Sequence, residues 1–507
     1  MHLKYKYVFI ISLCCLMTGC STTRDLYTSR GGKTKRAFRG AWIQTVFQEE
    51  YRKMTPAALK LELVRRLDTL QACGINAVIF QVRPEADAFY KSAIEPWSRF
   101  YTGRQGVAPE GDFDVMKFLI AACHKRNMEF HAWLNPYRAA ASANMEFAGS
   151  HLYRTCPERF VRYNNQILFD PGIPENRRHI CRVVRDIVSR YDVDAIHMDD
   201  YFYPYPVAGA PFPDDKSFHR YGLTKGYTEE MRGEWRRENV NTLVRELKQA
   251  IVLEKPWVRF GISPFGIYRN RKSTPDGSGS ETNGLQNYDD LYADILYWIE
   301  EGWIDYTIPQ IYWEIGHQAA DYAVLTKWWS RHTGKGHLYI GQDVARTMKA
   351  GQLTEKMAFA RRFPRIDGHC FWPANELLWN NTGVADSLKR HYHRYPALIP
   401  PYAAMHRKRP AEVKGLRVER TAEGRRLSWE AGQSAEDPEL AAYFVVYRFG
   451  KRGRLDLDDP AHILAVTRAT SYALPAEGEK ETFRYVVTAV DRFHNESKKG
   501  RKIKVKP

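Results

Sequence analysis

Short β-rich runs alternate with amphipathic stretches of helical spacing along most of the chain. The runs begin near Gly40, Asn76, Glu129, Asp194, Arg259, Asp305, His337 and Gly368. The helical stretches cover residues 56–73, 114–126, 175–191, 229–253, 288–301, 321–332, 353–363 and 384–393. Eight such alternations within residues 39–395 predict a closed parallel (β/α)8 barrel, the TIM barrel fold. An open doubly wound sheet is the alternative, but no Gly-rich phosphate loop follows the first run.

The pattern changes after Tyr395. Prolines at positions 396, 400, 401 and 410 predict a linker over residues 396–410. Residues 411–507 alternate apolar and polar positions between turns and show no helical spacing, so we expect a second, small all-β domain there. With Trp429 on an early strand and Tyr485 on a late one, this part resembles a fibronectin type III sandwich, and we expect no catalytic residue in it.

The first 20 residues have the pattern of a processing signal. Basic residues at positions 2, 4 and 6 precede an apolar run over residues 8–17, which is too short to span a bilayer. The sequence Leu-Met-Thr-Gly-Cys at residues 16–20 resembles the lipobox of bacterial lipoproteins. We therefore predict a lipoprotein signal over residues 1–20 with Cys20 lipidated, and a flexible tether over residues 21–38. This predicts a membrane-anchored protein of the bacterial cell envelope; an ordinary secretory signal is the alternative.

The formal net charge of +17 raises the question of an anionic partner. The basic residues are dispersed, and an exported lipoprotein rarely meets nucleic acid, so we expect no nucleic-acid partner. The dense basic run over residues 498–506 favours anionic lipid headgroups or acidic wall polymers, with a plain solvated surface as the alternative. Five widely spaced cysteines outside the signal argue against a disulfide framework or a cysteine-based zinc site.

Polar residues gather where the predicted strands end, which is where barrel enzymes hold their active sites. Strand alternation places one set of these residues inside the barrel. They are Gln81, Arg83, His131, Trp133, Asn135, His197, Asp199, Gly261, Ser263, Gln310, Tyr312 and Glu314, with Asp200 at the mouth. Because burying so many polar groups is costly unless they bind one another or a ligand, we predict a binding site at this end of the barrel.

Paired carboxyl groups in such a site suit the hydrolysis of a glycosidic bond, where one protonates the leaving oxygen and the other is a nucleophile or activates water. Asp199 or Asp200 is the candidate for the ionised member, held in that state by hydrogen bonds from neighbours such as Arg83 or Asn135. The candidates for the protonated acid are Glu314, desolvated by Tyr312 and Trp313, and its rival Asp87 in the loop after the second strand. Glu85, Asp343 and Glu376 are weaker candidates.

Each of these residues also has a purely structural interpretation. An adjacent Asp pair can cap a helix or form a turn, and Glu314 can be a solvated loop residue. His131 and His197 can be hydrogen-bonded core residues. Trp133, Trp313 and Trp372 can pack in the core, although tryptophans at strand ends also make platforms for sugar rings. A metal site of Asp199, Asp200, His131 and His197 is an alternative, but no H-x-H or H-E-x-x-H spacing supports it, so we expect no metal or cofactor.

Several phrases of the barrel resemble the glycosyl-hydrolase-like family 10 lipoproteins. They are Arg-Gly-Ala-Trp at 39–42, Gln-Val-Arg-Pro at 81–84 with Ala-Asp-Ala-Phe-Tyr at 86–90, Trp-Leu-Asn-Pro-Tyr-Arg at 133–138, Phe-Asp-Pro-Gly at 169–172, His-Met-Asp-Asp-Tyr-Phe-Tyr-Pro at 197–204, Gly-Ile-Ser-Pro-Phe-Gly at 261–266, Gly-Trp-Ile-Asp-Tyr at 302–306 and Pro-Gln-Ile-Tyr-Trp at 309–313. The resemblance implies a barrel glycosidase acting on bacterial envelope glycan, with peptidoglycan strands as the leading substrate. It favours Asp199, Asp200 and Asp87 over Glu314 among the acids, and its phrases add Arg138 and Tyr203 to the substrate-binding candidates.

These observations together predict a lipid-anchored glycoside hydrolase. The main alternative is a glycan-binding lipoprotein that does not cut its ligand, and the second is a metal-dependent hydrolase on a barrel. Chain length and pattern leave the oligomeric state open.

Overall fold

The structure of the protein is a computed structural model that describes residues 34–422, 424–432, 441–475 and 481–507. The predicted signal, Cys20 and nearly all of the predicted tether lie outside the described residues. Among the helices of the described part, none is both long and apolar enough to cross a membrane.

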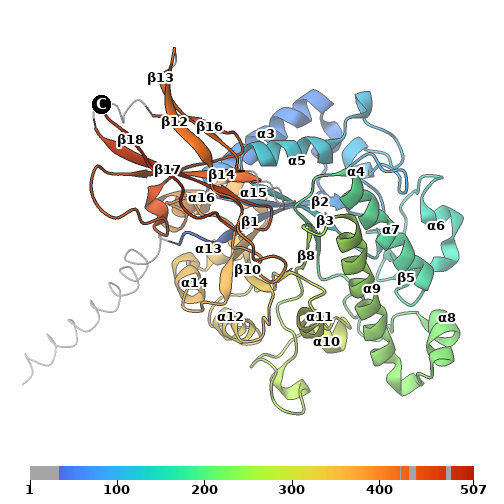
Figure 1. Ribbon diagram of the computed structural model, residues 1–507. Coiled ribbons are helices and arrows are strands. Elements are labelled where there is room, and N and C mark those ends of the chain that lie inside the picture. The colour runs from blue at the N-terminus through green and yellow to red at the C-terminus, as the bar shows by residue number, and fades with distance from the viewer. Residues whose placement is uncertain (1–33, 423, 433–440, 476–480) are drawn as a thin grey trace, which may run out of the picture.

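Eight parallel strands close into a barrel, which confirms the predicted fold (Figure 1). Around the barrel the order is β1-β11-β10-β9-β8-β7-β3-β2. The strands are β1 (Phe38–Ile43), β2 (Ala77–Arg83), β3 (Glu129–Leu134), β7 (Ala195–Met198), β8 (Arg259–Ile262), β9 (Tyr306–Thr307), β10 (His337–Asp343) and β11 (Ile366–Trp372). Each of them falls on one of the predicted β-rich runs.

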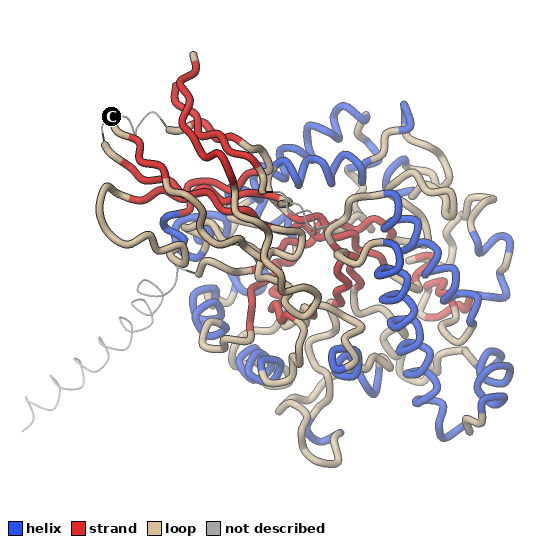
Figure 2. Tube along the Cα trace, in the orientation of Figure 1, coloured by secondary structure: helices blue, strands red, loops and turns tan. Residues whose placement is uncertain are grey.

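Helices cover the outside of the barrel, as the tube in Figure 2 shows. They are α3 (Pro56–Ala72), α4 (Arg99–Thr102), α5 (Val115–Lys125), α6 (Leu152–Thr155), α7 (Pro174–Arg190), α8 (Asp215–Ser217), α9 (Arg232–Glu254), α10 (Asn287–Asp290), α11 (Ile295–Glu300), α12 (Tyr322–Ser330), α13 (Val344–Lys349), α14 (Leu353–Ala360), α15 (Ala374–Trp379) and α16 (Val384–Ser387). Short 3-10 or π turns lie at Tyr51–Lys53, Glu110–Asp112, Pro157–Arg159, Phe218–Gly222, Leu223–Lys225, Glu229–Met231, Arg271–Ser273, Leu388–Tyr392 and Pro460–His462.

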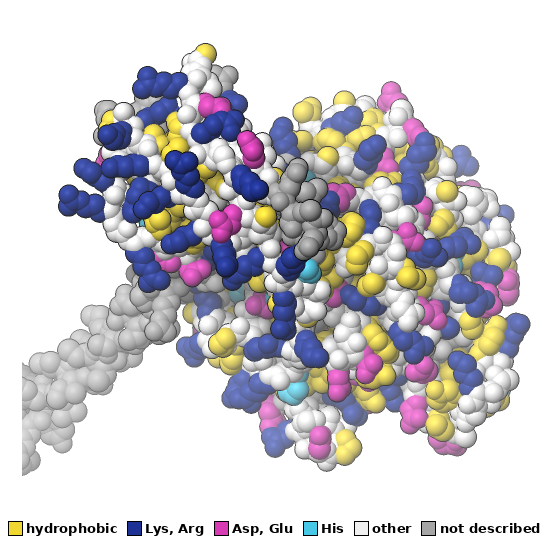
Figure 3. All heavy atoms as spheres, in the orientation of Figure 1, with side chains coloured by type: hydrophobic (Ala, Val, Ile, Leu, Met, Phe, Trp, Pro, Cys, Tyr) yellow, Lys and Arg dark blue, Asp and Glu magenta, His cyan; other side chains and the backbone are white. Residues whose placement is uncertain are grey.

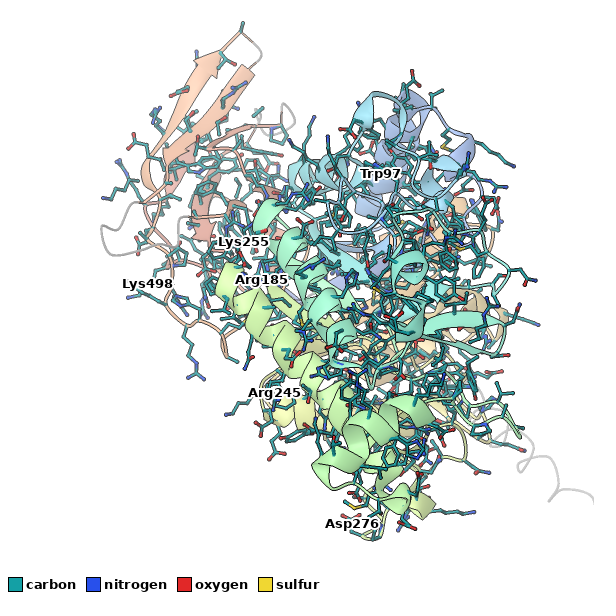
Figure 4. All side chains as sticks on the ribbon, turned by 90° about the vertical axis from the view of Figure 1, so that its right-hand side faces the viewer. Trp97, Arg185, Arg245, Lys255, Asp276 and Lys498 are labelled. Atoms are coloured by element: carbon teal, nitrogen blue, oxygen red, sulfur yellow. The ribbon has the colours of Figure 1, made fainter. Side chains whose placement is uncertain are left out.

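Local sequence explains where the main helices begin and which face they bury. The Thr55 hydroxyl accepts from the backbone N–H of Ala58 and Pro56 takes the first position of α3, a favourable helix start. In α7 the buried positions recur at helical spacing, from Ile180 to Val188, and pack on the barrel. The neighbouring helices α7 and α9, which carry the labelled Arg185 and Arg245, run side by side in Figure 4.

The interior of the barrel is filled by aromatic rings rather than by aliphatic layers alone. Tyr306 of β9 crosses the axis, where a Cβ on Gly261 would lie 1.9 Å from its ring. Only glycine leaves room there, which gives the predicted inward position of Gly261 its physical reason. Tyr402, from the predicted linker, is buried against this interior cluster and closes the barrel at the amino ends of its strands.

A small antiparallel sheet follows β3, and the sequence pattern did not predict it. It has the order β4-β6-β5, with β4 at Arg138–Ala140, β5 at Phe160–Tyr163 and β6 at Gln166–Phe169. Strands of three or four residues carry too little alternation to be separated from a loop. The sheet holds Arg138 at the mouth of the barrel.

Residues after the predicted linker form two antiparallel sheets, which confirms a small all-β domain. One sheet has the order β12-β13-β16 and the other β15-β14-β17-β18. The strands are β12 (Lys414–Thr421), β13 (Gly424–Glu430), β14 (Tyr443–Phe449), β15 (Ile463–Thr467), β16 (Ser471–Ala473), β17 (Phe483–Val490) and β18 (Ile503–Val505). Trp429 and Tyr485 share the core of this domain. Its assignment to the fibronectin type III class, and the domain boundaries, stay predictions.

The C-terminal domain packs on the end of the barrel where the strands begin. Arg492 pairs with Asp192 at 2.7 Å, and the Asn127 amide donates to the Val466 carbonyl at 2.5 Å. Lys and Arg side chains are spread over the visible face of both parts and are dense on the C-terminal domain (Figure 3). The carboxyl ends of the strands, where the sequence predicts a binding site, lie at the opposite end of the barrel.

Candidate active site

A cleft of about 280 Å³ opens at the carboxyl ends of the barrel strands. Nine of the residues predicted from the sequence line it: Gln81, Trp133, Arg138, Asp199, Asp200, Ser263, Gln310, Tyr312 and Trp372. Five further lining residues were not predicted: Trp42, Gln44, Val46, Phe47 and Tyr201. Residues in or directly after seven of the eight barrel strands contribute, so the barrel itself fixes the geometry of the site.

Asp199 follows β7 and points into the cleft, where only 5% of its surface is exposed. Trp133 Nε1 donates to its Oδ2 at 3.0 Å, and Asn135 Nδ2 donates to both carboxylate oxygens at 3.2 Å. Burial raises the pKa of Asp199 to about 6, against the lowering effect of Arg138 and of these hydrogen bonds. The carboxyl group therefore changes its charge close to neutral pH.

Asp200 lines the same cleft and is 2% exposed. The Tyr205 hydroxyl donates to its Oδ2, and Gln310 Nε2 donates to its Oδ1 at 3.0 Å. Burial raises the pKa of Asp200, and the two hydrogen bonds oppose that rise. Two neighbouring carboxyl groups buried in one cleft disfavour double ionisation, so the pair is suited to share a proton.

Aromatic rings form the walls of the cleft. The Trp133 and Trp372 rings meet edge to face with centroids 6.2 Å apart, and the Trp42 ring lies beside them in the cleft lining. At the rim, Tyr201 is 39% exposed and Phe47 is 62% exposed. Flat apolar walls around buried carboxyl groups match the alternating apolar faces and polar edges of a sugar.

Two polar atoms in the cleft wall have no hydrogen-bond partner. Gln81 uses its Oε1 to accept from the backbone N–H groups of Thr45 and Val46, which leaves its Nε2 free. The Ser263 hydroxyl is also buried and without a partner. Buried polar atoms of this kind cost free energy unless a ligand satisfies them, so they mark positions where a substrate hydroxyl or carbonyl would bind.

Other predicted binding residues lie behind the cleft wall. Arg83 is fully buried, pairs with Glu95 at 2.6 Å and donates to the Asn135 carbonyl, so it holds the Asn135 loop in place. The expected hydrogen bond from Arg83 to Asp199 or Asp200 is not formed. Tyr203 is buried against Phe212, and Trp313 packs on Phe265. None of these side chains lines the cleft.

His131 and His197 lie on the barrel axis beneath the cleft floor. Both rings are hydrogen-bonded to the Tyr306 hydroxyl, at 2.8 and 3.1 Å respectively. Neither lines the cleft, so direct contact with substrate, as expected from strand alternation, is not supported by their positions. They are hydrogen-bonded core residues, the second of the two interpretations open from the sequence.

Asp87 does not share the cleft with the aspartate pair. Its carboxyl group is fully buried and accepts from Gln105 Nε2 at 3.0 Å and from the Glu85 backbone N–H at 3.1 Å. Burial, with a smaller effect of the Glu85 charge, raises the pKa of Asp87 to about 7. This geometry shapes the loop after β2 and corrects the expectation that Asp87 faces Asp199 across the substrate.

Glu314 is exposed and lies outside the cleft. Strand β9 ends at Thr307, and a tight turn with Ile311 N–H donating to the Pro309 carbonyl breaks the alternation that predicted an inward glutamate. The weaker candidates are also elsewhere. Glu85 pairs with Arg99, Asp343 caps α13, and Glu376 lies in the first turn of α15.

Some of the cleft residues that were not predicted do have a recognisable sequence pattern. Trp42 and Gln44 are two and four residues after Gly40, so strand alternation along β1 places all three on the same face of the strand. Tyr201 and Tyr205 belong to the loop after Asp200, where no periodicity applies. Among the described residues, no group of three or more His, Cys, Asp or Glu side chains could hold a metal ion.

A (β/α)8 barrel with paired acids in an aromatic cleft at its strand ends has the architecture of a glycoside hydrolase. Residues 37–358 match the family model described as Glycosyl hydrolase-like 10. The chain is 37% identical over 490 residues to glycosyl hydrolase YngK of Bacillus subtilis strain 168, covering 93% of this chain and 94% of that protein. It is 34% identical over 364 residues to glycosyl hydrolase DigH of Escherichia coli strain K12, covering 66% and 81% respectively.

Solved structures with a similar barrel include the glycoside hydrolase domain of PgaB (BpsB) from Bordetella bronchiseptica, at 10% identity and a TM-score of 0.45, covering 70% of this chain and 98% of that one. Another is the catalytic domain of β-amylase from Paenibacillus polymyxa, at 11% identity and a TM-score of 0.46, covering 71% and 99%. The chain belongs to the Glycosyl hydrolase-like 10 family and is a glycoside hydrolase.

Proposed function

We propose that the enzyme cuts glycan of the bacterial cell envelope, with peptidoglycan strands as its substrate. The observation that carries this proposal is the pair Asp199 and Asp200 in one ring-walled cleft. The cleft is open at its rim, where Tyr201 and Phe47 are exposed, and this suits a long chain that passes across the site.

The two aspartates have different roles in the proposed reaction, and their surroundings determine which role each takes. Both oxygens of Asp199 accept hydrogen bonds from Trp133 or Asn135, which favours its carboxylate form. Asp200 follows it at the mouth, where burial raises its pKa and so favours retention of its proton. Asp200 is therefore the proposed general acid for the leaving oxygen, and Asp199 the carboxylate that stabilises positive charge at the sugar.

The nucleophile in this scheme comes from the substrate. Among the described residues that line the cleft, Asp199 and Asp200 are the only acids. A 2-acetamido sugar can use its own carbonyl oxygen, which bonds to the anomeric carbon as the glycosidic C–O bond breaks and Asp200 gives its proton to the leaving oxygen. Water then opens the oxazolinium ring and returns a proton to Asp200, while Asp199 holds the acetamido N–H.

The proposed location follows from the sequence of the first 20 residues. A lipobox-like segment ending at Cys20 supports anchorage to a membrane of the cell envelope by a lipid on that cysteine. Peptidoglycan is the acetamido-sugar polymer within reach of such an anchor.

Purified peptidoglycan glycan strands, native or chemically de-N-acetylated, test the proposal. We expect new reducing ends from the native strands, and binding without cleavage for the de-N-acetylated ones. Equal cleavage of both would contradict the role of the acetamido group. Cleavage of an unrelated glycan but not of native strands would contradict the substrate.

A further inference from the structure

A continuous line of hydrogen bonds runs along the barrel axis from the C-terminal domain to the cleft. Every member is buried. Its links are His494 Nε2 to Glu129 Oε1 at 2.6 Å, Glu129 Oε2 to His131 Nε2 at 2.9 Å, His131 Nδ1 to the Tyr306 hydroxyl at 2.8 Å, that hydroxyl to His197 Nδ1 at 3.1 Å, and His197 Nε2 to Trp42 Nε1 at 3.2 Å. Trp42 is the member that lines the cleft.

With a neutral His131 ring, the donors between Trp42 and Glu129 all point toward Glu129. The Trp42 indole N–H is always a donor, so His197 Nε2 accepts and its Nδ1 carries the proton. His197 then donates to the Tyr306 oxygen, whose single proton goes to His131 Nδ1. His131 therefore donates from Nε2 to Glu129, which as a carboxylate is an acceptor alone.

Glu129 is held in its ionised state from both parts of the protein. Arg259 of β8 donates to its Oε1, and so does His494 of the C-terminal domain. The pKa of Glu129 lies well below its ordinary value because these partners outweigh the cost of burial. The pKa of His197 lies well below its ordinary value because of burial, which agrees with a neutral ring that accepts from Trp42.

The turn that carries His494 is built to reach the barrel. Asp491 accepts from the backbone N–H groups of Phe493 and Asn495 and from the Asn495 side chain. His494 itself has a φ of +62°, a left-handed conformation that non-glycine residues adopt at a cost. The Tyr443 hydroxyl donates to its Nδ1 at 2.9 Å, which directs Nε2 at Glu129.

We propose that Glu129 is a positioning residue for glycan binding, acting through His131, Tyr306 and His197 to fix the Trp42 ring in the cleft wall. The C-terminal domain completes this arrangement through His494, so it is part of the catalytic unit rather than a spacer. This inference rests on the proposed function only for the identity of the glycan used as a ligand.

Replacing Glu129 with Gln tests the direction of the hydrogen bonds between Trp42 and Glu129. The Gln amide has one acceptor and one donor end, and because Arg259 and His494 both donate at the Oε1 position, the amide oxygen stays there and the N–H groups face His131. His131 must then change tautomer, Tyr306 must donate to His197, and His197 must present an N–H to the Trp42 N–H. Two donors then face each other, and the Trp42 ring loses its fixed position.

The experiment uses the full chain with Glu129→Gln and, as the milder change, Tyr306→Phe, which removes the middle oxygen of the line. The matched control is Tyr339→Phe, a fully buried tyrosine of the same cluster whose hydroxyl contacts Tyr402. We expect KM for peptidoglycan strands to rise about tenfold in the first two variants, the effect of one lost contact, with kcat nearly unchanged. The control keeps both values.

A double-variant cycle separates positioning from a general loss of stability. Once Trp42→Phe has removed the indole N–H, adding Tyr306→Phe or Glu129→Gln should raise KM no further. ¹⁵N spectra of the histidines, with His197 assigned by a His197→Gln variant, give a readout independent of activity: His197 should be protonated at Nδ1. Additive effects on KM, an unchanged KM in Tyr306→Phe, or a His197 ring protonated at Nε2 would each overturn the proposal.

Discussion

The Trp133 indole donates a hydrogen bond to Asp199 at 3.0 Å and also forms a wall of the cleft with its ring. Trp133 therefore affects both the shape of the sugar site and the protonation state of Asp199. The bond favours the charged form of Asp199, whose pKa burial has raised to about 6.

Trp133→Phe should therefore move the acid limb of the pH–rate profile. The ring wall stays, but the carboxylate loses a donor, so the pKa of Asp199 rises further and the limb shifts to higher pH by about 1 unit. The measurement is kcat/KM on glycan strands between pH 4 and 9. Trp372→Phe is the matched control, since the ring contact with Trp133 changes but no bond to Asp199 is lost; a limb that moves equally in both variants speaks against the assignment.

Ser263→Ala should weaken substrate binding without destabilising the fold. The buried Ser263 hydroxyl has no partner in the protein, so its removal relieves an unsatisfied group and costs only the contact with the sugar. We expect KM to rise about tenfold and Tm to stay equal or to increase. Thr307→Val removes another buried, unpartnered hydroxyl that does not line the cleft and should leave KM unchanged. Equal KM for Ser263→Ala and wild type would refute a substrate contact here.

Asp87 should make the fold less stable as the pH rises. Its pKa is raised to about 7 in the folded protein from 3.8, so between these values the unfolded chain binds fewer protons and the free energy of unfolding falls with increasing pH. Wild type should lose Tm between pH 5 and pH 8, and Asp87→Asn should lose less. Asp68→Asn is the control because its pKa is lowered by Arg126 and it titrates below this window. An identical pH dependence in wild type and Asp87→Asn would contradict a protonated Asp87.

Cys20→Ala should release the protein from the membrane. Lipidation of Cys20 is the sole anchor that the sequence predicts, so the variant should move from the membrane pellet to the soluble fraction of a bacterial host and fail to incorporate labelled palmitate. The wild-type chain should carry the label. A wild-type chain without label would contradict the lipoprotein assignment.

Strand periodicity was enough to predict the barrel and most of the cleft. Gln81 lies within β2, Asp199 and Ser263 directly follow β7 and β8, and alternation along these strands predicted all three positions. The same rule failed at Glu314 because β9 stops at Thr307, seven residues earlier, and the chain turns before it.

Parity also says nothing about depth along the barrel axis. His131 and His197 point inward as expected, but they lie below the cleft floor and bind Tyr306 rather than substrate. Arg83 pairs with Glu95, which lies in the irregular segment directly after β2, where no periodicity applies. The contacts with Tyr306 join strands far apart in the chain, which no local pattern encodes.

Cleavage by aspartate variants is the most direct test of the central claim that Asp199 and Asp200 hydrolyse envelope glycan. New reducing ends from purified peptidoglycan strands would be measured for wild type, Asp199→Asn, Asp200→Asn and Glu314→Gln, with strand binding assayed in parallel. We predict a loss of about 1,000-fold or more in both aspartate variants with binding retained, and wild-type rates for Glu314→Gln, whose side chain lies outside the cleft. Substantial cleavage by either aspartate variant, or its loss in Glu314→Gln, would contradict the assignment.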